Sequence, residues 1–490
     1  MATAMTELLP LKPFIGGQYV DSKSTERITL FSAVDDSTVT SELHSSGAED
    51  VNRAVKAAEE ALPAWKAKSA AEKRDILLRF SDLILEHAER LGYLDSIVSG
   101  KPALFSRVLE PQGAAESFKF FAGYTDKLNG ECLPADGEGF LRMVRYEPLG
   151  VCAGINAFNA PLGTFGFKVA PALAAGNVII IKASERHPLS TLALGELANR
   201  AGIPAGVINI ITGTAEAGIA LSEHPRIRKI SFTGSVGVGK QVQIAATKSN
   251  LKRVTLELGG KSPFIVFGDA DVKAAVEGAA QTSLSLNGQG CVLGMRMYVH
   301  ESLAEAFVQG LKVAYEMHAS TLGGDPHSLT TMSSPVYHHH QRDIVLGFLE
   351  KGKQEAELVT GGARYGKQGC YIEPTIFYRP LPGAEITKKE IFGPVVCIDT
   401  FTSDEEVVHK ANDTEYGLGA YIYTTNIDRA LRVSSQIEAG TVCVNNIQVV
   451  SPAMPFGGFK SSGVGRENGI HALRHYTEPK SVIVKYSKVE

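Results

Sequence analysis

The feature that most constrains the fold is a regular alternation of short apolar runs and amphipathic segments between residues 150 and 246. The apolar runs have the length of strands and cover residues 150–155, 177–182, 207–211 and 230–233. Residues 189–201 place apolar side chains at three- and four-residue spacing, and further helices are expected near 218–222 and up to Ala246. This order predicts a parallel α/β sheet with right-handed crossovers.

A second α/β block is expected between residues 261 and 456, because a chain of 490 residues is longer than one hydrophobic core accommodates. Its strand candidates are residues 262–267, 296–300, 395–401, 420–423 and 441–445. Outside the two blocks, the apolar pattern predicts helices over 48–66 and 70–90 and strands over 140–146 and 480–486.

The composition argues against nucleic acid and membranes as partners. The net charge is -4, and no apolar run approaches the length of a membrane span. The first 14 residues lack a basic region followed by an apolar core, so they do not resemble a signal peptide, and a cytoplasmic location is expected.

No metal site is expected. The six cysteines form no CxxC pair, which argues against structural zinc. The run His338-His339-His340 looks like a metal-binding segment, but consecutive residues point to different faces of a helix. We interpret the run as a solvated helix face.

The segment Ser285-Leu-Asn-Gly-Gln-Gly-Cys291 is the first candidate for chemistry. Its glycines allow the backbone to approach a substrate closely, and a cysteine on such a turn can be accessible with a stabilised thiolate. The alternative is a structural cysteine on a glycine-rich loop.

Two further segments carry candidate catalytic groups. Glu257 stands between leucines at a strand end, where desolvation raises a carboxyl pKa toward the range of a general base; the alternative is an exposed glutamate. Asn159 precedes Ala-Pro, and its amide could donate to an oxyanion, although Asn and Pro together often mean only a turn.

Two strand ends are candidate nucleotide sites. Lys182 and Glu185 follow an apolar run, and ligands of open α/β sheets bind beyond the carboxyl ends of strands. The turn Gly234-Ser-Val-Gly-Val-Gly239 leads into a helix whose N–H groups could face a pyrophosphate. Its glycine spacing is not GxGxxG, and each segment could be a plain strand–helix turn.

Taken in this order, the segments resemble the aldehyde dehydrogenase superfamily, over about residues 14–486. Glu257-Leu-Gly-Gly-Lys and Gly288-Gln-Gly-Cys291 with Arg296 are the most specific matches. Further similar motifs are Lys168 with Pro171-Ala-Leu-Ala-Ala-Gly-Asn177, Glu390-Ile-Phe-Gly-Pro394, Asn412 with Tyr416-Gly417, and Pro455-Phe-Gly-Gly-Phe-Lys-Ser-Ser-Gly463.

The resemblance implies a mechanism. Cys291 would attack an aldehyde carbon, the Asn159 amide and the Cys291 backbone N–H would hold the oxyanion, and hydride would pass to a nicotinamide. Glu257 would then activate water to hydrolyse the thioester. Lys168 is expected among the catalytic residues.

The resemblance also implies the cofactor contacts. Lys182 and Glu185 would bind the adenine-side ribose, and Gly234 and Ser235 the pyrophosphate. The remaining cofactor-binding residues would be Glu390, Phe392 and Phe158. A carboxylate at position 185 repels a 2′-phosphate, so NAD is expected, while Lys182 leaves NADP possible.

Departures from the family pattern bear on the substrate. Phe158 replaces the usual tryptophan, Ala160 replaces a bulky residue, and Leu286 replaces an asparagine. Ala160 is expected to enlarge an aldehyde tunnel, which predicts tolerance for an aromatic or otherwise bulky aldehyde. The tunnel is expected to be lined by Ala160, Phe167, Val450 and Phe456.

The implied architecture is α/β, with a Rossmann-like cofactor domain of residues 1–124 and 149–257 and an α/β catalytic domain of residues 258–472. Residues 125–148 and 473–490 would form a small β extension for oligomerisation, giving a homodimer or a homotetramer. Two other functions stay open. One is an enzyme that passes the acyl group to coenzyme A, against which Glu257 argues; the other is a catalytically retired NAD-binding protein.

Overall fold

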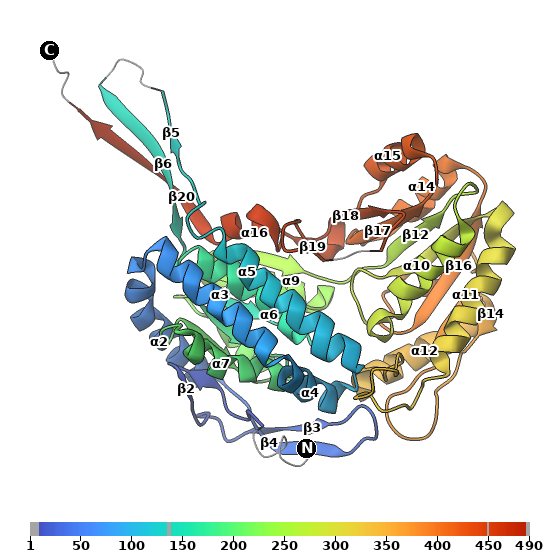
Figure 1. Cartoon of the computed structure of the whole chain (residues 1–490), viewed down its shortest axis with the longest axis horizontal. Coiled ribbons are helices and arrows are strands. Elements are labelled where there is room, and N and C mark those ends of the chain that lie inside the picture. The colour runs from blue at the N-terminus through green and yellow to red at the C-terminus, as the bar shows by residue number, and fades with distance from the viewer. Residues whose placement is uncertain (1–8, 135–138, 448–449, 487–490) are drawn as a thin grey trace.

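The computed structural model describes residues 9–134, 139–447 and 450–486. Figure 1 shows two α/β lobes side by side and a thin β arm that projects away from the first lobe. The predicted α/β class is confirmed, and the strands are divided among two large sheets, the arm and a small hairpin.

The first lobe is built on an eight-stranded sheet of order β19-β11-β10-β7-β8-β9-β1-β2. Its five central strands are parallel to their neighbours, and β19, β1 and β2 pair antiparallel at the two edges. The strands are β1 (Phe14–Ile15), β2 (Gln18–Tyr19), β7 (Val151–Ile155), β8 (Val178–Lys182), β9 (Ile208–Ile211), β10 (Lys229–Thr233), β11 (Arg253–Glu257) and β19 (Gly463–Val464).

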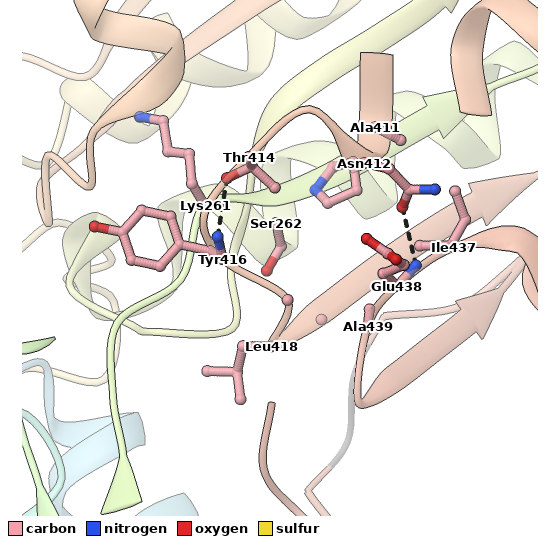
Figure 2. A pocket seen from close by; sticks show the side chains of 13 residues that line it. Lys261, Ser262, Ala411, Asn412, Thr414, Tyr416, Leu418, Ile437, Glu438 and Ala439 are labelled. Atoms are coloured by element: carbon pink, nitrogen blue, oxygen red, sulfur yellow. Dashed lines mark hydrogen bonds between the residues drawn. The ribbon is translucent and has the colours of Figure 1, made fainter. Parts of the chain in front are cut away.

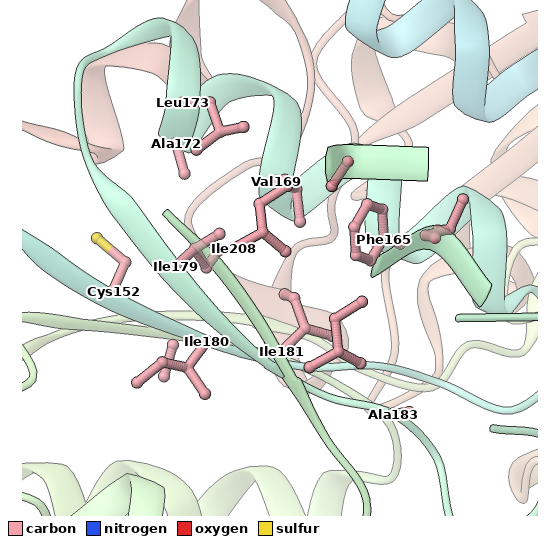
Figure 3. Packing of buried hydrophobic residues seen from close by; sticks show 14 of the residues in the cluster. Cys152, Phe165, Val169, Ala172, Leu173, Ile179, Ile180, Ile181, Ala183 and Ile208 are labelled. Carbon is pink, nitrogen blue, oxygen red and sulfur yellow. The ribbon is translucent and has the colours of Figure 1, made fainter. Parts of the chain in front are cut away.

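The sheet of the first lobe is covered on both faces, which explains why its strands are continuous apolar runs rather than alternating ones. All five residues of β8 are buried. Figure 3 shows Phe165 and Val169 of α6 (Pro161–Ala174) packed beside Ile179 and Ile181, in the same buried cluster as Ile180. The intervening helices are α7 (Leu189–Ala201), α8 (Ala215–Glu223) and α9 (Val236–Ser249).

The chain before residue 124 adds helices to this lobe and a hairpin of β3 (Arg27–Phe31) and β4 (Thr38–His44). The helix predicted over 70–90 is two helices, because the backbone at His87 leaves the helical region. The helices are α2 (Ala48–Ala67), α3 (Ala70–Glu86), α4 (Ala88–Ser99), a π-helical turn (Leu104–Leu109) and α5 (Glu110–Ala122).

The second lobe contains a seven-stranded sheet of order β14-β15-β16-β13-β12-β17-β18, parallel except for β14. Its strands are β12 (Ser262–Val266), β13 (Gly294–His300), β14 (Glu357–Thr360), β15 (Thr375–Tyr378), β16 (Val395–Phe401), β17 (Gly419–Tyr423) and β18 (Thr441–Val444). Its helices are α10 (Val272–Leu284), α11 (Ala304–Ala319), α12 (His339–Glu355), α13 (Glu385–Lys388), α14 (Asp404–Asn412) and α15 (Ile427–Gln436).

The arm is a three-stranded antiparallel sheet of β5 (Glu131–Cys132), β6 (Phe140–Pro148) and β20 (Thr477–Lys485). Helix α16 (Gly469–His475) leads into it. It is formed by the described parts of the two segments predicted for oligomerisation; residues 135–138 and 487–490 of those segments lie outside the described residues. In residues 9–134, 139–447 and 450–486, no helix is long and apolar enough to cross a membrane.

Candidate active site

A cleft of about 640 Å³ lies at the carboxyl ends of β7, β8, β10 and β11, where ligands of parallel sheets bind. The second lobe contributes the Cys291 turn, the start of α12 and residues 390–392. The structure therefore brings ten of the fifteen predicted site residues to one cleft, namely Phe158, Asn159, Lys182, Glu185, Gly234, Ser235, Glu257, Cys291, Glu390 and Phe392.

Cys291 follows a turn whose backbone is unusual. Leu286, Asn287 and Gly288 all have positive φ, and a Cβ on Gly288 would come within 2.1 Å of the Gly393 carbonyl oxygen. The turn holds the half-buried Cys291 side chain in the cleft. Burial and the carboxyl groups of Glu390 and Glu257 raise the pKa of the Cys291 thiol, so the thiol form predominates in this arrangement.

Asn159 lies between β7 and α6, and its side-chain amide donates to the Gln289 carbonyl at 2.8 Å. Gln289 is two residues before Cys291, so this bond joins the amide to the cysteine turn. The entry of α6 is fixed by the buried Glu110, whose carboxylate accepts from the Leu162 N–H at 2.8 Å. A side-chain amide donor is thereby held near the thiol.

Glu257 is the last residue of β11 and is 2% exposed. Both of its carboxylate oxygens are buried, and neither has a hydrogen-bond partner among the residues that the structure describes. Burial and the neighbouring Glu467 raise the pKa of Glu257 well above its ordinary value. A carboxylate with a raised pKa is a stronger base than an ordinary glutamate, which suits Glu257 to accept a proton.

Lys168 does not line the cleft. It is fully buried in α6, and its ammonium donates to Thr233 Oγ1 and to Glu467 Oε1, each at 2.6 Å. Glu467 also accepts from Ser231 Oγ at 2.9 Å. Sequence reasoning missed Glu467, and its only local signal is a charged pair, Arg466-Glu467, inside a glycine-rich stretch.

Lys182 and Glu185 form an ion pair of 3.0 Å at the end of β8. Burial opposes ionisation of Glu185, but Lys182, the Glu185 backbone N–H and Arg186 together hold the pKa of Glu185 below its ordinary value. Ser235 caps α9 by accepting from the Val238 N–H, and both residues line the cleft, so the N-terminus of this helix lies at its edge.

Glu390 and Phe392 face this region from the second lobe. Glu390 accepts from the Gly260 N–H at 2.9 Å, and burial raises the pKa of its carboxyl to about 7. The Phe392 ring meets the Phe158 ring edge-on, with centroids 5.7 Å apart. These two aromatic rings form an apolar part of the cleft lining.

Comparisons with known proteins agree with this geometry. The model of the aldehyde dehydrogenase family matches residues 19–482. The chain belongs to the aldehyde dehydrogenase family. Aldehyde dehydrogenase 1 of Tanacetum cinerariifolium is 44% identical over 96% of this chain and 94% of its own length. Human retinal dehydrogenase 2 is 41% identical over 99% of this chain and 93% of its own length.

The fold matches a solved family member equally well. The structure of the P. syringae indole-3-acetaldehyde dehydrogenase AldA, in complex with NAD+ and IAA, superimposes with a TM-score of 0.94. It is 36% identical and covers 99% of both chains. This aldehyde dehydrogenase therefore has the family fold along its whole length, and it is an oxidoreductase acting on aldehydes.

The four predicted tunnel residues lie outside the lining of the 640 Å³ cleft. Ala160 precedes α6, and Phe167 of α6 meets the Phe456 ring with centroids 5.8 Å apart. Val450 is 39% exposed and follows residues 448–449, which are not described. The structure thus places Phe167 beside Phe456, and the role of all four residues as a tunnel lining stays a prediction.

The three consecutive histidines have three different environments. His338 caps α12 by accepting from the His340 N–H, His339 contacts Asp36 at 2.6 Å, and His340 lines the cleft. They do not converge on one point, and they form the start of a helix rather than a uniform solvated face.

A second, much smaller pocket lies in the second lobe, between β12 and residues 411–419 (Figure 2). Asn412 accepts there from the Glu438 N–H at 2.9 Å. The pocket has room for about 10 Å³, which suits a single water molecule and no organic ligand. The Asn412 and Tyr416-Gly417 motif therefore has a structural role in the second lobe and does not line the cleft.

The reactivity of Cys291 should respond to its carboxylate neighbours. Since Glu390 raises the thiol pKa, Glu390→Gln should lower it and increase the thiolate fraction near neutral pH. We expect faster alkylation of Cys291 by iodoacetamide, with the pH profile shifted to lower pH. An unchanged profile would show that Glu390 does not raise the pKa of the Cys291 thiol. Cys132, exposed on the arm, supplies the internal reference thiol.

Proposed function

We propose that this aldehyde dehydrogenase oxidises its aldehyde to a carboxylic acid with NAD, through a thioester on Cys291. The observation that carries the proposal is the buried Glu257 carboxyl group, which lines the same cleft as Cys291 and Asn159. In the described parts of the chain, neither of its oxygens has a hydrogen-bond partner. A water molecule held there would satisfy the carboxyl group and be available for hydrolysis.

The residues of the chain account for each covalent step. The Cys291 thiol gives up its proton to solvent, its Sγ bonds to the aldehyde carbon, and the carbonyl electron pair moves to oxygen, where the Asn159 amide and the Cys291 N–H stabilise it. One such donor contributes ~2.7–4 kcal/mol. The nicotinamide, when bound, supplies the hydride acceptor. Glu257 then removes a proton from water, the water oxygen bonds to the thioester carbon, and Cys291 leaves as thiolate.

NAD fits the nucleotide side of the cleft. The α9 N-terminus presents N–H groups, and Gly234 keeps the adjoining turn free of a side chain. AldA of P. syringae binds NAD+ in its own solved structure. The ionised Glu185 would accept from a ribose 2′-hydroxyl and repel a 2′-phosphate.

Glu185→Gln should therefore relax the cofactor preference. Removing the charge should raise kcat/KM with NADP relative to NAD by about tenfold or more, since tenfold corresponds to ~1.4 kcal/mol. Steady-state kinetics with both cofactors measure the ratio. Glu216→Gln, an exposed glutamate of α8 that does not line the cleft, is the matched control. An unchanged ratio in Glu185→Gln would contradict the assignment.

For the substrate, we propose an aromatic or otherwise bulky aldehyde. Ala160 follows Asn159 in the chain and carries only a methyl group, and the paired rings of Phe167 and Phe456 offer an apolar surface. Ala160→Leu should raise KM for benzaldehyde-type substrates while leaving short aliphatic aldehydes little changed. A wild-type enzyme that strongly prefers short aliphatic aldehydes would refute the substrate proposal and leave the reaction class intact.

We further propose that residues 1–124 and 149–257 form the cofactor domain, residues 258–472 the catalytic domain, and residues 125–148 and 473–490 the oligomerisation strands of a homodimer or homotetramer. The exposed edges of the arm support this assembly. The six cysteines are all free thiols, which supports a reducing compartment such as the cytoplasm.

The reaction is tested by following NADH with aromatic and aliphatic aldehydes, with and without coenzyme A. We expect NADH formation and a free acid as product, independent of coenzyme A, because Glu257 provides the base that hydrolysis needs. An acyl-coenzyme A product would favour the acyl-transferring alternative. NAD binding without any turnover would favour the retired protein.

A further inference from the structure

A cluster of metal-ligating side chains lies outside the cleft, at a contact between the two lobes. Asp36 comes from the turn between β3 and β4, His339 from the first residue of α12, and Cys370 from the loop before β15. One carboxylate oxygen, one ring nitrogen and the Cys370 Sγ all lie within 4.8 Å of one another.

The backbone around the cluster is fixed by contacts between the lobes. The Cys370 N–H donates to the Ala33 carbonyl at 2.8 Å, and the Gly369 N–H donates to Asp36 Oδ2 at 3.0 Å. Gly369 has positive φ, and a Cβ there would come within 2.2 Å of the Val34 carbonyl oxygen. These contacts hold the segments that carry Asp36 and Cys370 beside each other, and α12 supplies His339.

We propose that Asp36, His339 and Cys370 bind one zinc-like divalent ion, with water as the fourth ligand. Thiol, imidazole and carboxylate form a mixed set that suits zinc rather than magnesium or calcium. The Asp36 and His339 side chains are 37% and 35% exposed, which leaves an entry path and room for water.

The existing distances require only a small adjustment. Ligand atoms around a tetrahedral zinc ion lie ~3.2–3.8 Å apart, given zinc–ligand bonds of ~2.0–2.3 Å. His339 Nε2 and Asp36 Oδ1 are hydrogen-bonded at 2.6 Å, so they would separate slightly, and the ion would replace that bond. Cys370 Sγ is buried and would close the site from the protein side.

Binding releases a proton from Cys370. Zinc binds cysteine as the thiolate, so the ion displaces the thiol proton to solvent.

The site differs from the metal site that three adjacent histidines suggest. Only His339 takes part, and its neighbours cap the helix or line the cleft. The ion would attach the β3–β4 turn of the first lobe to α12. Gln341 of α12 donates to the Ile391 and Phe392 carbonyls, so the ion would lie at the base of the segment that presents Glu390.

The test uses the full-length Cys291→Ala protein, so that the proposed nucleophile cannot bind the probe. Titration with cobalt(II) should show one ion per chain and a near-ultraviolet thiolate-to-cobalt absorption band. Zinc should compete for the same site, raise the thermal midpoint, and release about one proton per ion, measured by calorimetry in buffers of different ionisation enthalpy.

Variants locate the site. His339→Ala and Cys370→Ser should each weaken binding by about tenfold or more, and Cys370→Ser should also remove the band. Asp36→Asn, at an exposed position, gives a second measure if the Cys370 variant folds poorly. His340→Ala is the matched control and should bind normally. The proposal is overturned if the band is absent, if Cys370→Ser retains it, or if His340→Ala weakens binding as much as His339→Ala.

Discussion

Cys291→Ala is expected to abolish aldehyde-dependent NADH formation, with a loss on the order of 10⁶-fold, as removal of a covalent nucleophile produces in other enzymes. No other described thiol lines the cleft, since the remaining cysteines lie in the sheets, the arm or the Cys370 loop. The half-buried side chain at the end of a turn leaves little packing to lose. Stopped-flow and steady-state measurements of NADH provide the readout.

Two controls make the result specific to the thiol. NAD affinity, measured by calorimetry, should stay near the wild-type value because the nucleotide side of the cleft is untouched. Cys132→Ala, which removes an exposed thiol from the arm, should retain activity. Turnover that survives in Cys291→Ala would mean that another group attacks the aldehyde.

Glu257→Gln should separate the two halves of the reaction. Thioester formation and hydride transfer should still occur once, which gives a burst of one NADH per active site. Hydrolysis should then slow by ~10²–10⁴-fold, because the amide cannot take a proton from water. Rapid-mixing absorbance resolves the burst, and mass spectrometry should detect the acylated protein.

The pH dependence of thioester hydrolysis provides an independent test of the role of Glu257. Burial and the neighbouring Glu467 raise the pKa of Glu257. As the pH falls, the wild-type carboxyl group therefore becomes protonated, and inactive as a base, at a higher pH than an ordinary glutamate does. Hydrolysis should slow as the pH falls through that raised pKa, and Glu257→Gln should lose this dependence. Loss of the burst itself would instead place Glu257 before hydride transfer.

The first lobe was predictable because its signals are local. The helix expected over 189–201 matches α7, and the strand expected over 177–182 matches β8 to within one residue. Burial on both faces makes such strands read as apolar runs. The short strands β14 and β15 were not predicted, because four residues beside loops carry little periodicity and their pairing partners are set by the tertiary fold.

The site was predictable where function is encoded in a continuous motif. Cys291, Asn159 and Glu257 each stand in a distinctive segment, and the fold brings them to one cleft. Glu467 was missed because Lys168, its partner, lies 299 residues away in the chain. The proximity of Gly457 to Glu257 was likewise not predictable from the sequence, since 200 residues separate them. A Cβ at position 457 would come within 2.5 Å of a Glu257 oxygen.

Because of the projecting arm, we expect the folding stability of one chain to depend on its association with a second chain. Its strands pair with each other but expose Leu141, Ile483 and Val484 to solvent, far from the core of either lobe. In the proposed assembly a second chain would cover these side chains, and mass action would then couple folding to protein concentration. The thermal midpoint should rise on concentrating the sample, and dilution should weaken the arm before it affects the cleft.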